Sequence, residues 1–369
     1  MKILFVLENY YPNIGGVETL FKSLCESLAQ SGYQIIVYTN KFDSNLEPEE
    51  HINNVKIIRA PFKNRYLFTL LGCIGAIKHA KGADIIHSTS YNAAIPAFIA
   101  GLVRRKKVII TFHEVWGKLW FKLPFMNKLT LSLHYLFEQM LLKLPFHKFI
   151  GVSKTTSSRL IESGVSSKRV HTILNGIDYS QITKRWEEHA GDSQFKFTFF
   201  GRLGISKGLD LLIPAFEILR KEHPNTKLNI VIPTSPKSFY DRILKIISSM
   251  NLMDHVEIHS NLPFEDLQEL IAHSNAVVIP SYSEGFCFAA VETMAIGTPI
   301  ISTDKGALQE VVTGQHIFVE ELNPSAIKDA LKRAVNDDWD FKATVKYPLS
   351  KSIAAYINLY ESIINTTIR

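Results

Sequence analysis

Two glutamates stand out for the chemistry they could perform: Glu284 and Glu292, separated by seven residues in IPSYSEGFCFAAVETMAIGTPIIST at 279–303. We expect Glu284, beside Gly285, in a loop after a strand, and Glu292 inside the helix that follows. A carboxylate where a loop enters a helix can accept hydrogen bonds from two sugar hydroxyls, and one about two turns along can bind a ribose diol. The alternatives are a helix-capping Glu284 and a solvated Glu292.

The backbone between these glutamates is a candidate phosphate site. Phe286, Cys287 and Phe288 would open the predicted helix, and backbone N–H groups at a helix N-terminus attract anions. This stretch could therefore hold the phosphates of a ligand whose sugar contacts Glu284.

Two basic residues in FFGRLGISKG at 199–208 could neutralise the same phosphates. Arg202 follows a strand expected to end at Gly201, and Lys207 precedes a predicted helix. Arginine offers a planar fork of N–H donors and lysine a point charge, so together they could balance a leaving diphosphate. The alternative is a pair of solvated surface charges.

The first half of the chain supplies a glycine pair and a histidine. Gly15 and Gly16 lie between a strand and a helix in NYYPNIGGVE at 9–18, where backbone could approach a phosphate closely. His113 ends a strand in TFHE and is a candidate for hydrogen bonding near a reacting centre. A plain turn and a structural histidine are the corresponding alternatives.

A repeated strand and helix pattern must position these residues. Short runs rich in Ile, Val and Phe alternate with amphipathic stretches, which predicts parallel sheets covered on both faces. The first series of strands is expected at 2–7, 34–39, 55–60, 84–88, 107–113 and 148–153. The second is expected at 195–201, 227–233, 255–260, 276–281 and 298–303.

The two series predict an α/β protein with two doubly wound, Rossmann-like domains. We expect domains at 1–179 and 180–349, because the polar stretch 180–194 shows no strand signal and is the best linker candidate. A chain of 369 residues also suits two domains. Apolar residues at helical spacing predict a last helix at 350–369, which must bury one face against a domain.

Composition and motifs narrow the function classes. With 46% hydrophobic and 21% charged residues the chain reads as a globular protein, and neither GxGxxG nor GxxxxGK(S/T) supports an NAD or P-loop site. The three cysteines, Cys25, Cys73 and Cys287, are far apart and indicate reduced thiols rather than a disulfide frame or a zinc site. We expect a cytoplasmic protein without a signal peptide or membrane-spanning helix.

Positive charge gathers in the first half. Residues 1–178 hold 22 Lys and Arg against 12 Asp and Glu, a net of +10, whereas residues 179–369 have a net of −4. Within 101–150, nine basic residues face only Glu114 and Glu138. Aromatic and basic residues interleave there: Trp116, Trp120, Phe121 and Phe125 with Lys118, Lys122 and Lys128. This mixture suits peripheral contact with an anionic membrane, although the aromatic residues could equally pack into the core or line an acceptor pocket.

Taken together, these segments resemble the family 4 retaining glycosyltransferases, which have the GT-B fold. The matching segments occur in order along the chain: GGVE (15–18), DIIHS (84–88), TFHE (111–114), GVSK (151–154), NGID (175–178), GRLGISKG (201–208) and PSYSEGF…ETMAIGTPII (280–301).

The resemblance implies roles for the candidate residues. Arg202 and Lys207 would bind the diphosphate of a nucleotide-sugar donor, Glu292 its ribose, and Glu284 with the backbone after it the transferred sugar. His113 would lie near the anomeric carbon, and the last helix would return to the first domain. Transfer to a glycan, lipid-linked or small-molecule acceptor would retain the anomeric configuration and need neither metal nor cofactor.

Some positions depart from the family pattern. Cys287 stands where glycine is common, and VIPTSPKS at 231–238 stands where a Gly-Asp-Gly turn is common, so base preference is open. The sequence DWD at 338–340 is superficially like an Asp-x-Asp metal motif, but it follows a helical run and reads as surface charge.

Other functions compete with transfer. A nucleotide-sugar epimerase on the same fold and a non-catalytic nucleotide-sugar binding protein are the main alternatives. Paired carboxylates can also indicate a glycosidase, although donor binding explains Glu284 and Glu292 better. No nucleic-acid motif accompanies the basic half, so we expect no nucleic-acid partner.

Overall fold

The computed structural model describes residues 1–13, 15–62, 64–182 and 194–365, and the chain divides into two compact units. Unit 1 comprises Met1–Lys122, Asn127–Gly176 and the C-terminal segment from Leu349, and unit 2 comprises Leu123–Met126 and Ile177–Pro348. Most of the stretch proposed as a linker, 183–193, lies outside the described residues.

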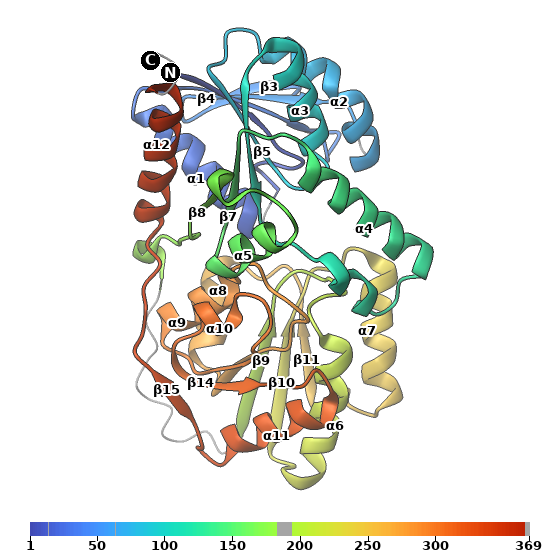
Figure 1. Ribbon diagram of the computed structural model, residues 1–369. Coiled ribbons are helices and arrows are strands. Elements are labelled where there is room, and N and C mark those ends of the chain that lie inside the picture. Colours follow the sequence, from blue (N-terminus) through green and yellow to red (C-terminus); the bar gives the residue numbers. More distant parts are fainter. Residues whose placement is uncertain (14, 63, 183–193, 366–369) are drawn as a thin grey trace. The chain divides into compact units, whose positions relative to one another are not determined.

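Unit 1 is built on one sheet with the strand order β3-β4-β2-β1-β5-β6-β7-β8 (Figure 1). All neighbouring strands are parallel except β3 and β4. The strands are β1 (Lys2–Val6), β2 (Gln34–Asn40), β3 (Glu49–Ile52), β4 (Val55–Ala60), β5 (Ile85–Thr89), β6 (Lys107–Phe112), β7 (Lys148–Gly151) and β8 (Val170–Thr172).

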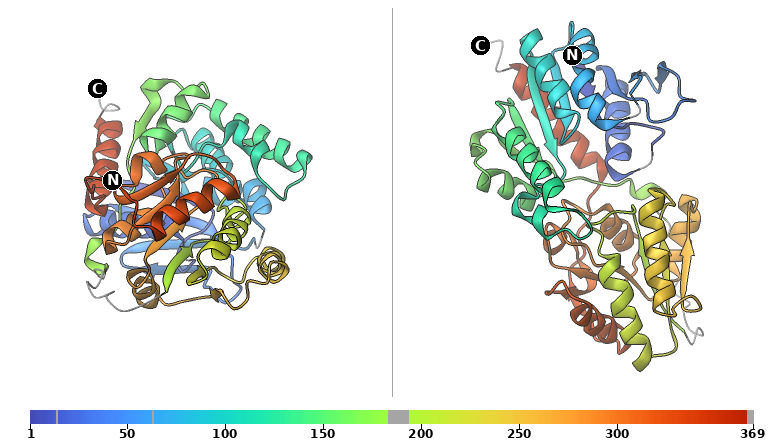
Figure 2. Two further views of the ribbon diagram at one scale, coloured as in Figure 1. Left: turned by 90° about the horizontal axis from the view of Figure 1, so that it is seen from below. Right: turned by 90° about the vertical axis from the view of Figure 1, so that its right-hand side faces the viewer.

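Helices cover the sheet of unit 1, as the ribbon views show (Figures 1 and 2). They are α1 (Gly16–Gln30), α2 (Arg65–His79), α3 (Ala94–Arg104), α4 (Lys128–Lys143), α5 (Lys154–Glu162) and α12 (Leu349–Asn365), with short 3-10 turns η1 (Gly117–Lys122) and η2 (Ser167–Arg169). The central strands are buried along almost their whole length, because helices lie on both faces of a parallel sheet.

Unit 2 repeats this architecture with the strand order β11-β10-β9-β12-β13-β14-β15, in which β15 alone among the described strands is antiparallel. The strands are β9 (Phe195–Phe200), β10 (Thr226–Val231), β11 (Val256–His259), β12 (Ala276–Ile279), β13 (Ile300–Thr303), β14 (Gly314–Val319) and β15 (Asp340–Lys342). The helices are α6 (Leu209–Glu222), α7 (Lys237–Ser249), α8 (Phe264–Ala272), α9 (Phe288–Ile296), α10 (Leu308–Val311) and α11 (Pro324–Val335), with the 3-10 turn η3 (Tyr179–Gln181).

The predicted fold class is confirmed. Both sheets are dominated by parallel strands joined through helices, which is the doubly wound arrangement. Each has its own core, in which Phe112 and Phe149 pack in unit 1 and Phe197 and Phe216 in unit 2. Within the described residues, no helix is both long and apolar enough to span a membrane.

The C-terminal helix α12 belongs to unit 1 and is fixed by buried polar contacts. The ring of His87, at the centre of β5, lies between the hydroxyl of Tyr360 at 2.6 Å and that of Thr111 at 2.8 Å. All three side chains are fully buried. Because buried polar groups without partners are costly, this chain of contacts sets where α12 packs on the sheet.

Candidate active site

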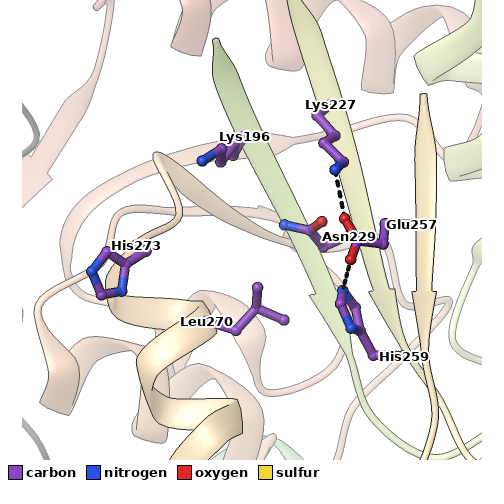
Figure 3. Close-up of a pocket in the computed structure, with 7 residues that line it drawn as sticks. All are labelled: Lys196, Lys227, Asn229, Glu257, His259, Leu270 and His273. Atoms are coloured by element: carbon purple, nitrogen blue, oxygen red, sulfur yellow. Dashed lines mark ion pairs between the residues drawn. The ribbon is translucent and has the colours of Figure 1, made fainter. Parts of the chain in front are cut away.

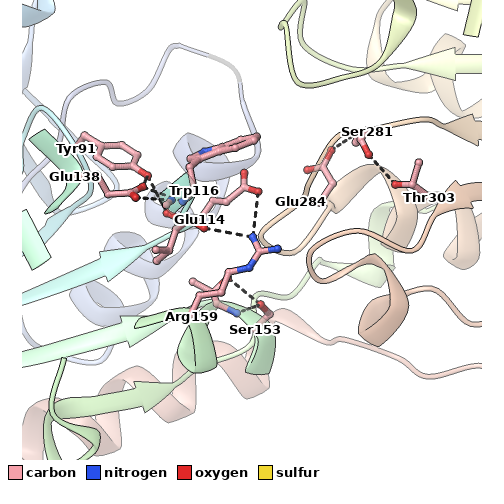
Figure 4. A network of polar contacts seen from close by, with 12 residues as sticks. Tyr91, Glu114, Trp116, Glu138, Ser153, Arg159, Ser281, Glu284 and Thr303 are labelled. Carbon is pink, nitrogen blue, oxygen red and sulfur yellow. Dashed lines mark hydrogen bonds and ion pairs between the residues drawn. The ribbon is translucent and has the colours of Figure 1, made fainter. Parts of the chain in front are cut away.

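In unit 2, Glu284 and Lys207 form an ion pair across two loops that lie far apart in the sequence. Lys207 Nζ donates to Glu284 Oε1 at 2.6 Å, and Ser281 Oγ donates to the same oxygen at 2.7 Å. Thr303 Oγ1 in turn donates to the carbonyl of Ser281 at 2.7 Å (Figure 4). Both loops follow the carboxyl ends of strands, where doubly wound sheets bind ligands.

Two glycines allow the loops to approach this closely. Gly208 has φ of +75°, and a Cβ there would collide with the carbonyl oxygen of Pro280. Gly306 has φ of +66°, and a Cβ there would meet the backbone of Glu284. Only glycine combines these left-handed angles with such contacts, so both positions shape the loop that carries Glu284.

The charge of Lys207 is maintained by its partner. Burial by itself lowers the pKa of the ammonium group, but the negative charge of Glu284 and the hydrogen bond to it outweigh burial, so the pKa is raised. The like charge of Arg202 acts weakly in the opposite direction, which places the exposed guanidinium in the same electrostatic environment. These two cations and Glu284 are therefore brought together, as the sequence predicted.

Helix α9 begins directly after this loop. Its N-terminal residue, Cys287, is buried with φ of +73° and makes no side-chain capping hydrogen bond. The first-turn N–H groups of α9 are thus not occupied by the capping side chain, which is the arrangement that binds phosphate groups at a helix N-terminus. Phe286 is buried against the ring of Tyr347 at 5.4 Å and supports the turn.

Glu292 lies inside α9 and is half-buried. Burial raises the pKa of its carboxyl group from 4.5 to about 7. A carboxylate with a pKa near neutrality in a prospective binding site is unusual, because an ordinary helix glutamate would be solvated and fully ionised. This property distinguishes Glu292 from the solvated helix residue that the sequence also allowed.

We expect the raised pKa of Glu292 to make nucleotide binding pH-dependent. The ionised carboxylate accepts hydrogen bonds from both ribose hydroxyls, so binding should favour the deprotonated form. Affinity should be constant well above pH 7 and fall below it, by at most about tenfold per pH unit. Calorimetric titration with a nucleotide diphosphate between pH 5.5 and 8.5 measures this. The dependence should flatten in Glu292→Gln, and an unchanged dependence there would assign it to another group.

The glycine pair of unit 1 opens α1. Gly15 is extended and caps the helix, and Gly16 is its first residue. A Cβ on Gly15 would overlap the carboxylate of Glu18, which accepts a hydrogen bond from Asn13 at 3.3 Å. Ile14, next to the pair, lies outside the described residues.

His113 follows β6 and is half-buried, with its ring edge-on to that of Phe21 at 6.0 Å. It lies close enough to His87 to contribute to lowering the pKa of that residue. The prediction placed His113 at a strand end, and the structure agrees. Its chemical role stays a prediction.

A buried carboxylate that the sequence did not single out fixes the loop after His113. Glu138 of α4 is completely buried and accepts hydrogen bonds from the backbone N–H of Trp116 at 2.9 Å and of Gly117 at 2.6 Å. It also accepts from the hydroxyl of Tyr91 at 2.7 Å (Figure 4). The three donors stabilise the carboxylate and hold this loop in one conformation. Its signal in the sequence was an acidic residue inside a strongly basic segment.

A second polar group lies at the carboxyl ends of β1 and β5. Glu8 accepts a hydrogen bond from Asn92 at 2.7 Å and forms an ion pair with Arg65 at 2.6 Å. Asn92 is held in turn by the hydroxyl of Thr69. Sequence analysis did not identify this group, because its members are separated by up to 84 residues.

A small cavity of about 140 Å³ lies on the sheet of unit 2, and none of the predicted site residues lines it (Figure 3). Within it Glu257 pairs with both Lys227 and His259, so its charges are largely balanced. Its lining residues are Lys196, Lys227, Asn229, Glu257, His259, Leu270 and His273. The donor-site residues lie instead on the loops after β9 and β12.

Sequence families match both units in the order that the structure gives them. Residues 14–181 match the model described as Glycosyltransferase Family 4, and residues 180–348 match that of Glycosyl transferases group 1. The chain belongs to the family 4 glycosyltransferases. It is thus an enzyme that transfers sugars.

Curated relatives of this glycosyltransferase include archaeal, bacterial and human proteins. An uncharacterized glycosyltransferase of Methanocaldococcus jannaschii is 26% identical, over 89% of this chain and 87% of its own. The mannosylfructose-phosphate synthase of Agrobacterium fabrum is 26% identical, over 82% of this chain and 74% of its own. A human protein of the phosphatidylinositol N-acetylglucosaminyltransferase is 24% identical, over 90% of this chain and 68% of its own.

Solved structures establish the GT-B fold for this glycosyltransferase. Sucrose-phosphate synthase from Thermosynechococcus elongatus superposes with a TM-score of 0.73 at 20% identity, covering 99% of this chain and 96% of its own. HepE of Anabaena, solved in complex with UDP and glucose, gives 0.72 at 18% identity, covering 100% and 99%. The predicted fold is therefore confirmed at the level of its family.

Proposed function

We propose that this glycosyltransferase transfers a sugar from a nucleotide diphosphate donor with retention of anomeric configuration and without a metal ion. The acceptor would be a glycan, a lipid-linked or a small molecule. The observation that carries the proposal is the group formed by Lys207, Glu284 and Arg202 beside the N-terminus of α9. It offers one anionic and two cationic partners to a sugar diphosphate.

The residues of unit 2 divide the donor between them. Arg202, Lys207 and the first N–H groups of α9 would bind the diphosphate, and the backbone of Phe286 to Phe288 would contribute those donors. Glu284 would accept hydrogen bonds from hydroxyls of the transferred sugar, and Glu292 from the ribose. HepE, which was solved in complex with UDP-glucose, supports a nucleotide-sugar donor by similarity of fold.

The proposed reaction is a front-face substitution. An acceptor hydroxyl attacks the anomeric carbon, the bond from that carbon to the diphosphate oxygen breaks, and the acceptor proton passes to the departing phosphate. Negative charge grows on the diphosphate during this step, and the cations are already in place to meet it. We assign His113 to hydrogen bonding with the transferred sugar.

Protein cations can take the part that a metal has in other transferases. Lys207 is held in its charged form by Glu284, and Arg202 stays protonated at any physiological pH. The DWD sequence is engaged elsewhere, because Arg333 forms ion pairs with both Asp338 and Asp340. We further propose that the enzyme works in the cytoplasm, and support comes from its free cysteines, two of which are buried.

We expect activity to survive chelation of metals. With EDTA present, turnover should stay within about twofold of the untreated enzyme, because Arg202 and Lys207 stabilise the leaving group. A thermal-shift screen against UDP-, GDP-, ADP- and dTDP-sugars first identifies the donor. Proton NMR of the product formed in EDTA then reports both rate and anomeric configuration.

Three outcomes would contradict the proposal in distinguishable ways. Loss of activity in EDTA that magnesium or manganese restores would show metal dependence. Inversion at the anomeric carbon would exclude the front-face mechanism. Conversion of the donor to an isomeric nucleotide sugar without any acceptor would identify an epimerase instead.

A further inference from the structure

One surface of unit 1 exposes an unusual number of large apolar side chains. Of the twenty-one such exposed residues in the described chain, eleven lie on α2, α3 and α4, which together hold only 42 residues. They are Tyr66, Leu67, Leu70, Leu71 and Ile74 on α2, Leu102 and Val103 on α3, and Leu129, Leu133, Leu136 and Met140 on α4. An apolar concentration of this kind marks an interaction surface.

The exposed residues follow the period of a helix. Leu70 and Ile74 are 71% and 75% exposed and lie one turn apart on α2, whereas Phe68 and Ala76 of the same helix are buried in the core. On α4, four exposed residues recur at intervals of four, three and four residues from Leu129. Each helix is thus apolar on its outer face as well as its inner face.

The three helices lie along one side of unit 1 (Figures 1 and 2). Helices α2 and α3 are joined by a hydrogen bond from Arg104 to the carbonyl of Ile77 at 2.9 Å. The positive charge of Arg65, the first residue of α2, contributes to lowering the pKa of His134 on α4. The start of α2 therefore lies near α4, and the apolar stripes belong to one surface, named here the α2–α4 surface.

This surface carries positive charge and almost no negative charge. Between residues 61 and 161 the chain has fifteen Lys and Arg and only three Asp and Glu. Of the three, Glu138 is buried and Glu114 is half-buried beside Arg159, while Asp84 accepts a hydrogen bond from the backbone of Lys2. Helices α2, α3 and α4 thus expose no carboxylate.

The aromatic residues proposed from the sequence to enter a membrane have other positions. Trp116 and Trp120 are half-buried, with Trp120 stacked on His134 at 4.9 Å, so they support the surface from beneath. Phe125 belongs to unit 2, where the guanidinium of Arg242 lies over its ring at 4.2 Å. Of the four, only Phe121 remains exposed within unit 1.

The charge distinguishes between the possible occupants of the α2–α4 surface. A symmetric dimer would place this surface against its own copy, so like charges would face one another. An anionic bilayer instead meets basic side chains with lipid phosphates and apolar stripes with the acyl boundary. Both properties of the surface favour the bilayer.

We propose that the α2–α4 surface docks the enzyme on an anionic lipid bilayer. Leu70, Ile74 and Leu133 enter the boundary between headgroups and acyl chains, and Lys122 and Lys128 meet the lipid phosphates. Compared with the sequence-based interpretation, the structure moves the inserting residues from the tryptophans to α2 and the outer face of α4.

Co-sedimentation with vesicles tests the proposal without donor or acceptor, so its outcome is independent of the transfer reaction. The full chain is mixed with vesicles of phosphatidylcholine alone or with phosphatidylglycerol added to about 30%, at about 50 mM and about 500 mM NaCl. We expect binding to the anionic vesicles at low salt and clear weakening at high salt, because salt screens charge. Binding to neutral vesicles should be much weaker.

Paired variants separate insertion from charge. Ile74→Ser with Leu133→Ser should weaken binding by about tenfold or more, because apolar insertion is lost. Lys122→Gln with Lys128→Gln should weaken it by about fivefold per charge removed and reduce its salt dependence. A matched control is Phe341→Ser with Lys342→Gln, whose side chains are exposed in β15 of unit 2 and should leave binding unchanged.

Contrary results are equally clear. No sedimentation of the parent protein with anionic vesicles at low salt would overturn the proposal, and so would variants that bind like the parent while unfolding at the same temperature. Light scattering after size-exclusion chromatography supplies the remaining test. A dimer broken by Ile74→Ser and Leu133→Ser, in a chain that ignores vesicles, would assign the surface to a second copy.

Discussion

Replacing Lys207 with alanine is expected to lower kcat by about 150-fold, or about 3 kcal/mol, with a much smaller change in the KM for the donor. The ammonium group meets charge that grows only as the bond to the diphosphate breaks. Its contribution is therefore larger in the transition state than in the bound donor complex. Steady-state kinetics with the donor identified by the thermal-shift screen measures both parameters.

The variant also removes the partner of Glu284, so folding must be checked. Glu284 keeps its hydrogen bond from Ser281 but loses the Lys207 ammonium at 2.6 Å. Lys221→Ala is a matched control, because that lysine is exposed on α6 and pairs with Glu217 of its own helix. A Lys207→Ala enzyme with normal kcat and normal unfolding temperature would remove Lys207 from the proposed mechanism.

Glu292→Ala should give the opposite kinetic pattern. Ribose contacts change little while the sugar is transferred, so the KM for the donor should rise with a smaller effect on kcat. The contrast between the two variants places each residue relative to the reacting bond. If both resemble the parent, the donor site lies elsewhere.

The strands that the sequence predicted are those with apolar residues on both faces. QIIVYT and KVIITF become β2 and β6, with boundaries shifted by one residue. Two antiparallel edge strands were not predicted, namely β3 and β15. Their sequences, EEHI and DFK, are short and mostly exposed, so no burial pattern distinguishes them from loop.

The site was predicted as a set of residue types, not as a geometry. Lys207 and Glu284 were both identified, but their contact joins loops separated by 77 residues and depends on Gly208 and Gly306. Spacing along a chain cannot report such a contact. Glu138 was treated as one of two acidic residues in a basic segment, although its complete burial makes it a structural support.

The charge asymmetry was readable from composition, but its partner residues were not. The interleaved Trp and Lys residues suggested insertion by tryptophan. Trp120 instead packs on His134, because a large ring is buried where the fold leaves room for it. The exposed stripe of α2 has the same composition as a buried helix, and only tertiary packing separates the two.

We expect His87 to make unit 1 sensitive to acid. Burial, with a smaller effect from the charge of His113, lowers the pKa of His87 to about 3, against 6.5 for an ordinary histidine. In the unfolded chain the ring takes up a proton near pH 6.5, whereas the folded ring stays neutral. Between these values the unfolded state binds more protons, so stability is greatest above pH 6.5 and falls as the pH is lowered.

The size of the effect follows from the shift. One such group lowers the free energy of unfolding by up to about 1.4 kcal/mol for each pH unit below 6.5. Urea unfolding at pH values from 4.5 to 7.5 measures this slope, and Trp116 and Trp120 report on unit 1 by fluorescence. Burial also lowers the pKa of His134, His147 and His171, so the whole protein should show a steeper slope than His87 alone provides.

The difference between variants isolates His87. His87→Gln should be less stable than the parent at pH 7.5, because glutamine cannot reach both Tyr360 and Thr111, but its slope should be shallower by about 1.4 kcal/mol per pH unit. Tyr360→Phe should cost about 1 kcal/mol and keep the slope, since the ring remains buried. His51→Gln, on an exposed strand, should match the parent in both respects. Equal slopes for the parent and His87→Gln would mean that the His87 ring takes up its proton in the folded state, and α12 would then have to be held on the sheet by packing rather than by this buried contact.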